Sequence, residues 1–343
     1  NIKLYKTNDI EKFFNGLSKI PQFDNFKASK AKELQNELLK PIGSLGKLEE
    51  FAIWMAGWQR EIRPSVKNAH CLIFAGNHGI ASKGVSAFPS EVTAQMVENY
   101  KKGGAAINQL CDLADLKLTV IPLDLEKPTR DFSENLAMDE EDVISAMQIG
   151  FDSVPPNCDL LVLGEMGISN TTSASAISCA LFDEPVESMT GIGTGLNKKQ
   201  LASKISLIKS ALKLHGSKFT STLKILSCFG GREIAAIAGS IISARLKCVP
   251  VLLDGFICTA AASSLILFDK NLLDHCLISH LSTEPGHLKI LSYLKKEPIL
   301  DLNLRLGEGS GAAIASLILK SALVTHNGMS TFSDANVTNK NYS

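Results

Sequence analysis

From residue 70 onward, short apolar runs alternate with longer helix-like segments, and this alternation limits the possible fold more than any other feature. Apolar strands that alternate with helices are typical of a parallel sheet covered on both faces. We therefore expect an α/β fold: a doubly wound, mostly parallel sheet flanked by helices, with a smaller helical N-terminal/C-terminal subdomain. The predicted strands are CLIFAG (71–76), LTVIPLD (118–124), DLLVLG (159–164), LKILSCFGG (223–231) and VPVLLDG (249–255).

The first sixty residues follow a different pattern, because apolar residues recur there at helical spacing among charged ones. Helices are predicted over 28–40 and 47–62, with a break at Pro41–Gly46. We expect residues 1–69 to pack as a small helical subdomain and residues 70–343 to form the α/β domain. Within that domain, further helices are predicted at 91–102, 197–216 and 231–248.

Composition argues against several classes of partner. The chain is 45% hydrophobic and 20% charged, which suits a globular protein with a sizeable core. Lys+Arg and Asp+Glu balance at 35 each without a long charge run, so we expect no nucleic-acid partner and no anionic-membrane surface. No stretch approaches the roughly 18 uninterrupted apolar residues of a membrane span. Residues 1–14 also lack the apolar core of a secretion signal.

The cysteines and histidines give no support for a disulfide framework or a metal centre. The eight cysteines are scattered, several lie in apolar runs, and none forms a C-x-x-C pair. This pattern is typical of buried free thiols in a reducing compartment, so we expect a cytoplasmic protein. The seven histidines have neither H-E-x-x-H nor H-x-H spacing, and we expect no metal site.

Glycines follow most of the predicted strands. In open α/β sheets, ligands bind beyond the carboxyl ends of the strands, where the connecting loops gather. One glycine there would be an ordinary turn, but several together favour a common binding crevice. Two of these loops also carry polar candidates, His78 and Asp254, each weak evidence alone. The loops are AGNHG (75–79), GEMG (164–167), FGG (229–231) and LDG (253–255).

A further glycine-rich segment, GIGTG (191–195), precedes a helix expected to open at Asn197. It matches neither the dinucleotide fingerprint nor a Walker A loop. The backbone N–H groups around Gly191 and Gly193, placed ahead of a helix, would suit a phosphate. Lys204 in that helix would add a charge-assisted contact. The alternative for Lys204 is an ordinary solvated helix lysine.

Two glutamates with glycine neighbours are the candidate acid–base groups. Glu308 lies between Gly307 and Gly309, ahead of an apolar segment of helical character over 312–324, and Glu165 directly follows a predicted strand. If the two meet in one crevice, one can act as general base while the other orients the substrate or stabilises developing positive charge. The alternatives are a helix-capping turn at Glu308 and loop-amide contacts at either carboxylate.

Seven motifs, in order, cover the chain from about Lys40 to Asn336. RLGEGSGAA (305–313) and GEMGISNTT (164–172) are the most specific. Together the motifs resemble those of the nicotinate-nucleotide–dimethylbenzimidazole phosphoribosyltransferase family, which acts in cobalamin lower-ligand synthesis. The others are KPIGSLGKLEE, AGNHGI with GVSAFPSEVTAQMV, GIGTGL, VLLDGF and SHLSTEPG.

The resemblance implies transfer of phosphoribose from nicotinate mononucleotide to dimethylbenzimidazole or a related aromatic base. The products are alpha-ribazole phosphate and nicotinate, with inversion at the anomeric carbon. Glu308 matches the base that removes the benzimidazole N–H proton as the other ring nitrogen attacks, and Glu165 matches a second acidic residue. Because the nucleotide already carries an activated glycosidic bond, no Mg²⁺ or other cofactor is expected. The resemblance also implies a homodimer.

The same resemblance assigns the substrate-binding residues. Lys204 and the GIGTG loop match the region that holds the phosphate, and Ser282 is expected nearby. Phe88 and Met96 match the lining of the lower-base pocket. The complete expected set is Phe88, Met96, Gly167, Gly191, Gly193, Lys204, Ser282, Gly307 and Gly309.

Two positions depart from the family pattern. Asn77 stands where members usually carry an acidic residue, and Arg232 where an apolar residue is more common. These departures leave the accepted base open: dimethylbenzimidazole, another benzimidazole, a purine or a phenol. The alternative functions are a non-catalytic nucleotide-binding relative with a regulatory role, or a transferase that uses a different base or donor. The presence of both Glu165 and Glu308 argues against the non-catalytic alternative.

Overall fold

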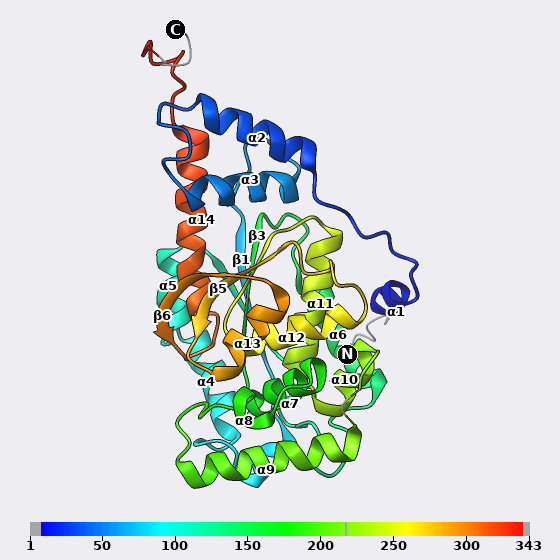
Figure 1. The fold of residues 1–343 in the computed structure, drawn as a ribbon. Helices are drawn as coiled ribbons and strands as arrows, with labels where there is room; N and C mark the ends of the chain where they lie inside the picture. Colours follow the sequence, from blue (N-terminus) through cyan, green and yellow to red (C-terminus); the bar gives the residue numbers. More distant parts are fainter. Residues whose placement is uncertain (1–7, 217, 339–343) are drawn as a thin grey trace.

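The computed structural model describes residues 8–216 and 218–338, and a six-stranded sheet lies within these ranges. Neighbouring strands in the sheet run parallel, in the order β2-β1-β3-β4-β5-β6. The predicted α/β class with a mainly parallel sheet is confirmed (Figure 1). The strands are β1 (Ala69–Ala75), β2 (Lys117–Pro122), β3 (Leu160–Met166), β4 (Val251–Leu253), β5 (Cys276–Ser282) and β6 (Pro298–Leu304).

Four of the five predicted strands are confirmed as β1, β2, β3 and β4, but the fifth prediction is wrong. Residues 223–229 belong to helix α10 (Thr222–Phe229), whose first turn is capped by Ser221. A short continuous apolar run fits a buried helix as well as a strand, and periodicity alone does not separate the two. The FGG segment therefore follows a helix and is not a loop at the end of a strand.

Two strands were not predicted, and both lead into the site described below. β5 carries His280 and Ser282 among its apolar residues, which hides its apolar pattern. β6 is an edge strand whose side chains are exposed or half-buried, so it lacks the apolar run of a central strand. The pairing of the two strands shifts register between His280 and Ser282.

Helices cover both faces of the sheet, as the doubly wound arrangement requires. Alternate side chains of β1 and β3 point into two separate apolar cores, one on each face. One core is closed mainly by α6 (Glu140–Ser153), α7 (Asn170–Phe182), α10, α11 (Arg232–Leu246), α12 (Phe256–Ser263) and α13 (Pro285–Leu294). The other is closed by α3 (Lys47–Gln59), α4 (Glu91–Lys101), α5 (Ala106–Leu113) and α14 (Ser310–Gly328).

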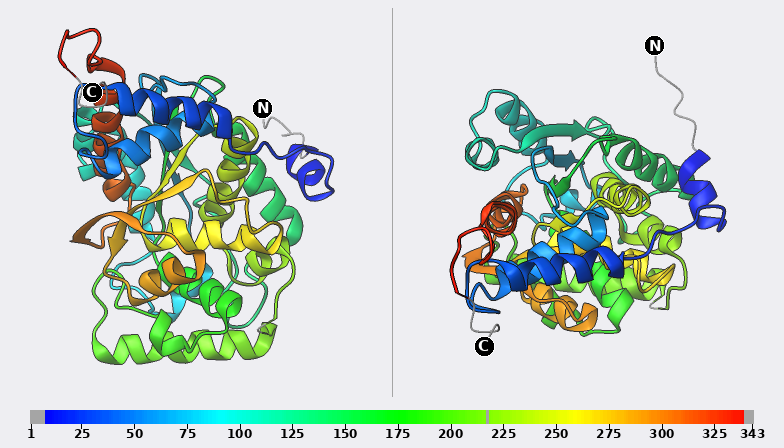
Figure 2. Two further views of the ribbon diagram at one scale, coloured as in Figure 1. Left: turned by 45° about the horizontal axis from the view of Figure 1, so that its top comes forward. Right: turned by 90° about the horizontal axis from the view of Figure 1, so that it is seen from above.

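The helices predicted near the N-terminus are present and pack against the C-terminal helix. Helix α2 (Asn25–Glu37) lies on α3, and α3 lies on α14. Figures 1 and 2 place α2 and α3 at one end of the molecule and α9 (Lys198–His215) at the opposite end. The shorter helices α1 (Asn8–Phe14) and α8 (Val186–Met189) complete the set described here. A domain boundary at residue 69 stays a prediction, and residues 1–7 lie outside the described residues.

The strand order creates a switch point between β1 and β3. The chain passes from β1 to β2 in one direction across the sheet and from β3 to β6 in the other. At such a point the loops leaving the carboxyl ends of the strands diverge and leave a crevice. Among the helices of the described residues, none is both long and apolar enough to cross a membrane.

Candidate active site

A cavity of about 330 Å³ opens at the carboxyl ends of the strands, beside the switch point. Its walls come from the ends of β3 and β5, the loops that follow β3, β4, β5 and β6, the loop before α9, and α4 with the loop before it. Of the four glycine-containing loops expected to share a crevice, 164–167 and 253–255 contribute to the lining, whereas 75–79 and 229–231 do not.

The cavity brings together most of the residues expected from the sequence. Eight of the eleven candidate site residues line it: Phe88, Met96, Glu165, Gly167, Gly193, Ser282, Gly307 and Glu308. The other three, Gly191, Lys204 and Gly309, lie directly behind its lining and contact it. Gly191 contacts Glu284, Lys204 contacts Thr171, and Gly309 belongs to the turn that carries Glu308.

Glu308 has an unusual backbone conformation. It is the middle residue of three in succession with positive φ: 77° at Gly307, 61° at Glu308 and 75° at Gly309. A left-handed conformation is unfavourable for a glutamate, and such residues cluster at functional sites where the surrounding structure holds them. One glycine on each side makes the turn possible. The turn leaves Glu308 at the edge of the cavity, with 8% of its surface exposed.

The two glycine-flanked glutamates lie close together. A Cβ atom added to Gly307 would overlap Oε1 of Glu165, so the glycine lets that carboxylate approach the Glu308 loop. A Cβ atom at Gly164 in β3 would likewise overlap the backbone of Gly309. These glycines are therefore needed for close approach of β3 to the turn before α14. Glu165 and Glu308 both line the cavity, so the two carboxylates share one crevice.

Burial shifts the acid–base behaviour of both carboxyls. Burial raises the pKa of Glu165 to about 8; the amide of Asn170, which donates to Glu165 Oε2, opposes this, and the charge of Asp254 adds to it. Burial also raises the pKa of Glu308, while the Tyr100 hydroxyl beside it acts in the opposite direction. Carboxyls with raised pKa values in a cavity are candidates for proton transfer near neutral pH.

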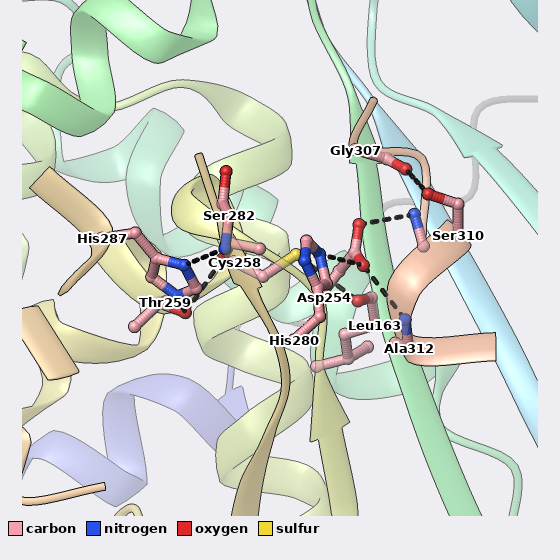
Figure 3. A network of polar contacts seen from close by, with 12 residues as sticks. Leu163, Asp254, Cys258, Thr259, His280, Ser282, His287, Gly307, Ser310 and Ala312 are labelled. Atoms are coloured by element: carbon pink, nitrogen blue, oxygen red, sulfur yellow. Dashed lines mark hydrogen bonds and ion pairs between the residues drawn. The ribbon is translucent and has the colours of Figure 1, made fainter. Parts of the chain in front are cut away.

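Asp254 fastens the loop that carries Glu308 to strand β4. Figure 3 shows Asp254 at the N-terminus of α14, where Oδ2 accepts from the N–H of Gly309 at 3.0 Å and Oδ1 from the N–H of Ala312 at 3.1 Å. His280 Nε2 lies 3.2 Å from Oδ1. Burial lowers the pKa of His280, but the hydrogen bond and charge of Asp254 outweigh this and leave that pKa raised. Asp254, which was weak evidence in the sequence alone, therefore holds the turn that carries Glu308 in place.

Lys204 is not a solvated surface lysine. Its side chain is fully buried, and Nζ donates to Oγ1 of Thr171 at 2.8 Å and to the carbonyl of Gly191 at 3.3 Å. Burial lowers the pKa of Lys204 to about 8, and the charge of Glu284 opposes this shift. A buried ammonium beside the lining residue Thr171 is suited to an anionic ligand.

The start of helix α9 differs from the expectation for GIGTG. Helix α9 does follow Asn197 as predicted, but the Asn197 side chain accepts from the N–H of Gln200, and the Gln200 side chain accepts from the N–H of Asn197. This capping box satisfies the N–H of Gln200, one of the donors that a helix N-terminus would offer a phosphate. The loop instead reaches the cavity through Gly193 and Thr194.

Part of the cavity lining is apolar. Val92 and Met96 lie four residues apart on one face of α4, and Phe88 precedes that helix with about half of its surface exposed. Ile168 and Leu306 add to the same lining. A cavity lined by apolar side chains and two carboxylates suits a flat aromatic ring that carries a polar edge.

Several lining or supporting residues were not predicted from the sequence. Glu284 and Arg305 follow β5 and β6, and these strands themselves were missed. Tyr100 was missed because it reads as an ordinary core residue of α4. Glu284 and Arg305 carry charges, but only correct placement of β5 and β6 would have marked them as part of the site.

The two departures from the family pattern lie outside the cavity lining and hold one loop. Asn77 Nδ2 donates to the carbonyl of Leu125 at 3.0 Å, and the Arg232 guanidinium donates to the carbonyl of Lys127. Both side chains therefore contact the segment that follows β2.

A second polar cluster lies buried under the same loops. His78 Nε2 pairs with Glu233 Oε1, and His78 Nδ1 lies 3.1 Å from Ser173 Oγ. A Cβ atom at Gly167 would approach Glu233 Oε1 to 2.8 Å, which places this cluster behind the lining of the cavity. Among residues 8–216 and 218–338, no group of three or more His, Cys, Asp and Glu is arranged to hold a metal ion.

Sequence comparison identifies the class of protein first. A family model described as a phosphoribosyltransferase (DBI_PRT) matches residues 20–337. The nicotinate-nucleotide–dimethylbenzimidazole phosphoribosyltransferase of Ruegeria sp. (strain TM1040) is 50% identical, over 96% of this chain and 97% of that protein. The protein of the same name from Jannaschia sp. (strain CCS1) is 50% identical, over 90% and 91%.

The fold comparison agrees with the sequence comparison. A crystal structure of nicotinate-nucleotide–dimethylbenzimidazole phosphoribosyltransferase from Thermus thermophilus matches with a TM-score of 0.85 at 33% identity, covering 92% of this chain and 99% of that one. The chain belongs to the nicotinate-nucleotide–dimethylbenzimidazole phosphoribosyltransferase family.

Proposed function

We propose that this protein transfers phosphoribose from nicotinate mononucleotide to dimethylbenzimidazole, giving alpha-ribazole phosphate and nicotinate. One observation carries the proposal: the turn at Gly307 places Glu308 and Glu165 together in a cavity with an apolar wall and a buried lysine. The names of the relatives, at about half identity over nearly the whole chain, support the same reaction.

In the proposed reaction, Glu308 acts as general base. It accepts the N–H proton of the benzimidazole while the other ring nitrogen forms a bond to the anomeric carbon. The bond from that carbon to the nicotinate nitrogen breaks, and its electron pair neutralises the pyridinium ring, which leaves as nicotinate. Because the incoming nitrogen attacks from the opposite face, the configuration inverts. The raised pKa of Glu308 suits a base that must hold a proton at neutral pH.

Glu165 is proposed to support the charge on the donor. Its pKa of about 8 means that the carboxyl is largely protonated at neutral pH in the ligand-free protein. The positively charged pyridinium of nicotinate mononucleotide favours the ionised form when it binds nearby. The carboxylate then stabilises the oxocarbenium character that develops as the glycosidic bond breaks. Lys204, Thr171 and Ser282 are proposed to hold the phosphate.

The test is release of free nicotinate when protein, nicotinate mononucleotide and dimethylbenzimidazole are mixed. We expect Glu308→Gln to lower kcat by about 10²–10⁴-fold, because it removes the base, while nicotinate mononucleotide binds as before. Glu297→Gln is a suitable control, since Glu297 is exposed and pairs with Lys47 at the surface. Turnover near the wild-type rate in purified Glu308→Gln would rule out the role given to Glu308.

The accepted base is settled by a panel of acceptors in the same assay. Dimethylbenzimidazole, benzimidazole, adenine and a phenol are compared by kcat/KM, and comparison of donors tests a transferase that uses another nucleotide. The apolar wall of Phe88, Val92 and Met96 favours benzimidazoles over purines, whose extra polar groups would lose water there. Absence of any nicotinate release would instead favour the non-catalytic alternative.

We also propose that the enzyme is a homodimer and works in the cytoplasm. In the described part of the chain all eight cysteines are free and seven of them are buried, which suits a reducing compartment. Val324 on α14 and Leu113 on α5 expose 71% and 70% of their surfaces, and a second copy would cover such residues. Light scattering should give about twice the chain mass of 36.9 kDa; a mass near 36.9 kDa would contradict the dimer.

A further inference from the structure

Glu284 is a buried carboxylate of the cavity wall that the proposed reaction leaves without a role. It follows β5 and forms the N-cap residue of α13, and only 7% of its surface is exposed. It lines the same cavity as Glu165 and Glu308. A carboxylate this buried is costly unless it has partners, so its contacts indicate its purpose.

One oxygen of Glu284 is held in place. Oε1 accepts a hydrogen bond from the backbone N–H of Gly193 at 2.9 Å, which ties the loop after β5 to the glycine-rich loop. The backbone N–H of Glu284 donates to Ser282 Oγ at 3.3 Å. A Cβ atom at Gly191 would overlap the carboxylate, so this glycine makes room for it. Gly191 and Gly193 therefore surround Glu284, although the sequence suggested that they surround a phosphate.

The other oxygen lacks a donor. Oε2 of Glu284 is buried and has no hydrogen-bond partner among the described residues. Buried carboxylate oxygens in proteins are normally satisfied by N–H or O–H groups. The carboxylate must turn toward the cavity for a ligand hydroxyl to supply this donor, because Oε2 has almost no accessible surface in the ligand-free protein.

The neighbours of Glu284 indicate which part of a ligand lies there. Lys204 Nζ donates to the carbonyl of Gly191, and Arg305 Nη1 donates to the carbonyl of Gly193 at 3.2 Å. Two cations thus flank the loop that Glu284 holds, which suits an anionic phosphate nearby. A carboxylate in the same place would repel a phosphate but would accept from hydroxyl groups. In a nucleotide, the ribose hydroxyls lie between the phosphate and the reacting carbon.

The loop after β5 is rigid enough to discriminate. The backbone N–H of Ser282 donates to His287 Nδ1 at 2.9 Å, and His287 Nε2 lies 3.0 Å from Thr259 Oγ1 (Figure 3). Burial lowers the pKa of His287 to about 3, so this ring stays neutral and keeps its hydrogen-bonding pattern at working pH. The segment that carries Glu284 is thus anchored on both sides.

We propose that Glu284 is the ribose-binding residue of this enzyme and accepts hydrogen bonds from the 2′- and 3′-hydroxyls of nicotinate mononucleotide. This inference rests on the proposed function, since it takes that nucleotide as the donor. It makes Glu284 the residue that selects ribonucleotides over their deoxy analogues, and it assigns the glycine-rich loop a share in sugar recognition through Gly193.

The test is a thermodynamic cycle in which the ribose hydroxyls of the nucleotide and the carboxylate of Glu284 are removed separately and together. Wild type, Glu284→Gln and Glu284→Ala are assayed with nicotinate mononucleotide and with its 2′-deoxy and 3′-deoxy analogues. We expect wild type to prefer the ribonucleotide by about ten- to a hundredfold in kcat/KM over at least one analogue, as for other sites built to bind a substrate hydroxyl. In Glu284→Ala that preference should fall to near one, and Glu284→Gln, which keeps one acceptor oxygen, should be intermediate.

Other outcomes overturn the inference. If Glu284→Ala lowers kcat/KM equally for all three nucleotides, Glu284 only supports the loop. If wild type does not discriminate among the three nucleotides, no carboxylate recognises the ribose hydroxyls and the inference is wrong. Glu297→Gln should keep the wild-type preference, because Glu297 lies on the surface. Should Glu284→Ala fail to fold, Glu284→Gln carries the comparison.

Failure of the proposed function is distinguishable from failure of this inference. Wild-type protein that releases no nicotinate from nicotinate mononucleotide and dimethylbenzimidazole contradicts the proposed reaction. Calorimetric titration with the three nucleotides then still compares their affinities for wild type and the Glu284 variants. Equal affinities in wild type would overturn the assignment of Glu284 by themselves.

Discussion

Glu308 is held in a conformation that glutamate rarely adopts. A left-handed residue other than glycine costs on the order of 1–3 kcal/mol and persists only where its surroundings over-determine it. Here the surroundings are Gly307 and Gly309 on either side and Asp254, which accepts from two N–H groups at the start of α14. This backbone strain indicates that the position of the Glu308 carboxylate matters for function.

Gly307→Ala tests this arrangement, with Gly103→Ala as its matched control. Gly307 and Gly103 have φ values of 77° and 76°, but only the Cβ atom at Gly307 would overlap Glu165; that at Gly103 meets open space. Both variants should lose about 1–2 kcal/mol of stability from the left-handed alanine. Gly307→Ala alone should also lose turnover, by on the order of a hundredfold, because the clash moves Glu165. Equal activity in the two variants would refute the contact.

At the scale of elements, two helices on one face of the sheet touch through their backbones. A Cβ atom at Gly239 of α11 would overlap the carbonyl of Met147 in α6, and one at Gly150 of α6 would overlap the carbonyl of Ala236 in α11. The two glycines face the partner helix reciprocally and allow a close approach. This pair determines how near α6 and α11 lie, and hence how the apolar core on that face is filled.

We expect Gly239→Ala to destabilise the protein by about 1–3 kcal/mol, because the added methyl group overpacks the contact between α11 and α6. Gly328→Ala is the control: Gly328 ends α14 and its Cβ would meet nothing within 4 Å. That change should be neutral or stabilising by about 0.5–1 kcal/mol, since alanine is the better helix former. Urea unfolding of both variants gives the comparison. A Gly239→Ala protein as stable as wild type would show that the helices separate at no cost.

Buried titratable groups set the pH dependence of the whole molecule. Burial raises the pKa of Glu165 from 4.5 to about 8, so its contribution to folding stability is complete below about pH 4.5 and is lost as the pH rises to about 8. Burial lowers the pKa values of His275 and His287 from 6.5 to about 3. Their contribution is complete above pH 6.5 and is lost as the pH falls toward 3.

Glu165→Gln should therefore change the pH dependence of stability only between about pH 4.5 and about pH 8. Glutamine stays neutral, so the variant should gain stability relative to wild type as the pH rises from about 4.5 to about 8 and gain no more above that. The difference should change by up to about 1.4 kcal/mol for each pH unit in this window. Thermal unfolding across pH 5 to 9 measures it. A difference that does not vary with pH would mean that Glu165 is ionised in the folded protein throughout this range.

The sequence alone determined the class of fold and part of the site. Four apolar runs that alternate with helical segments were enough to predict a doubly wound parallel sheet, because strands covered on both faces must be apolar throughout. Glycines beside Glu165 and Glu308 marked both carboxylates, since close approach and positive φ leave a signature in residue type. The motifs then identified the family. These signals are local, so they can be read without coordinates.

The tertiary structure decided what depends on contacts between distant segments. Residues 223–229 form a helix whose apolar side chains are buried against neighbouring helices. The spacing of apolar residues along the sequence does not reveal such contacts. β5 and β6 were hidden by their polar and exposed residues, and Glu284 and Arg305 with them. Only the assembled sheet revealed that Gly191 and Gly193 surround Glu284 and that Lys204 is fully buried. Burial and proximity are properties of the packed chain, and they turn these residues into a site.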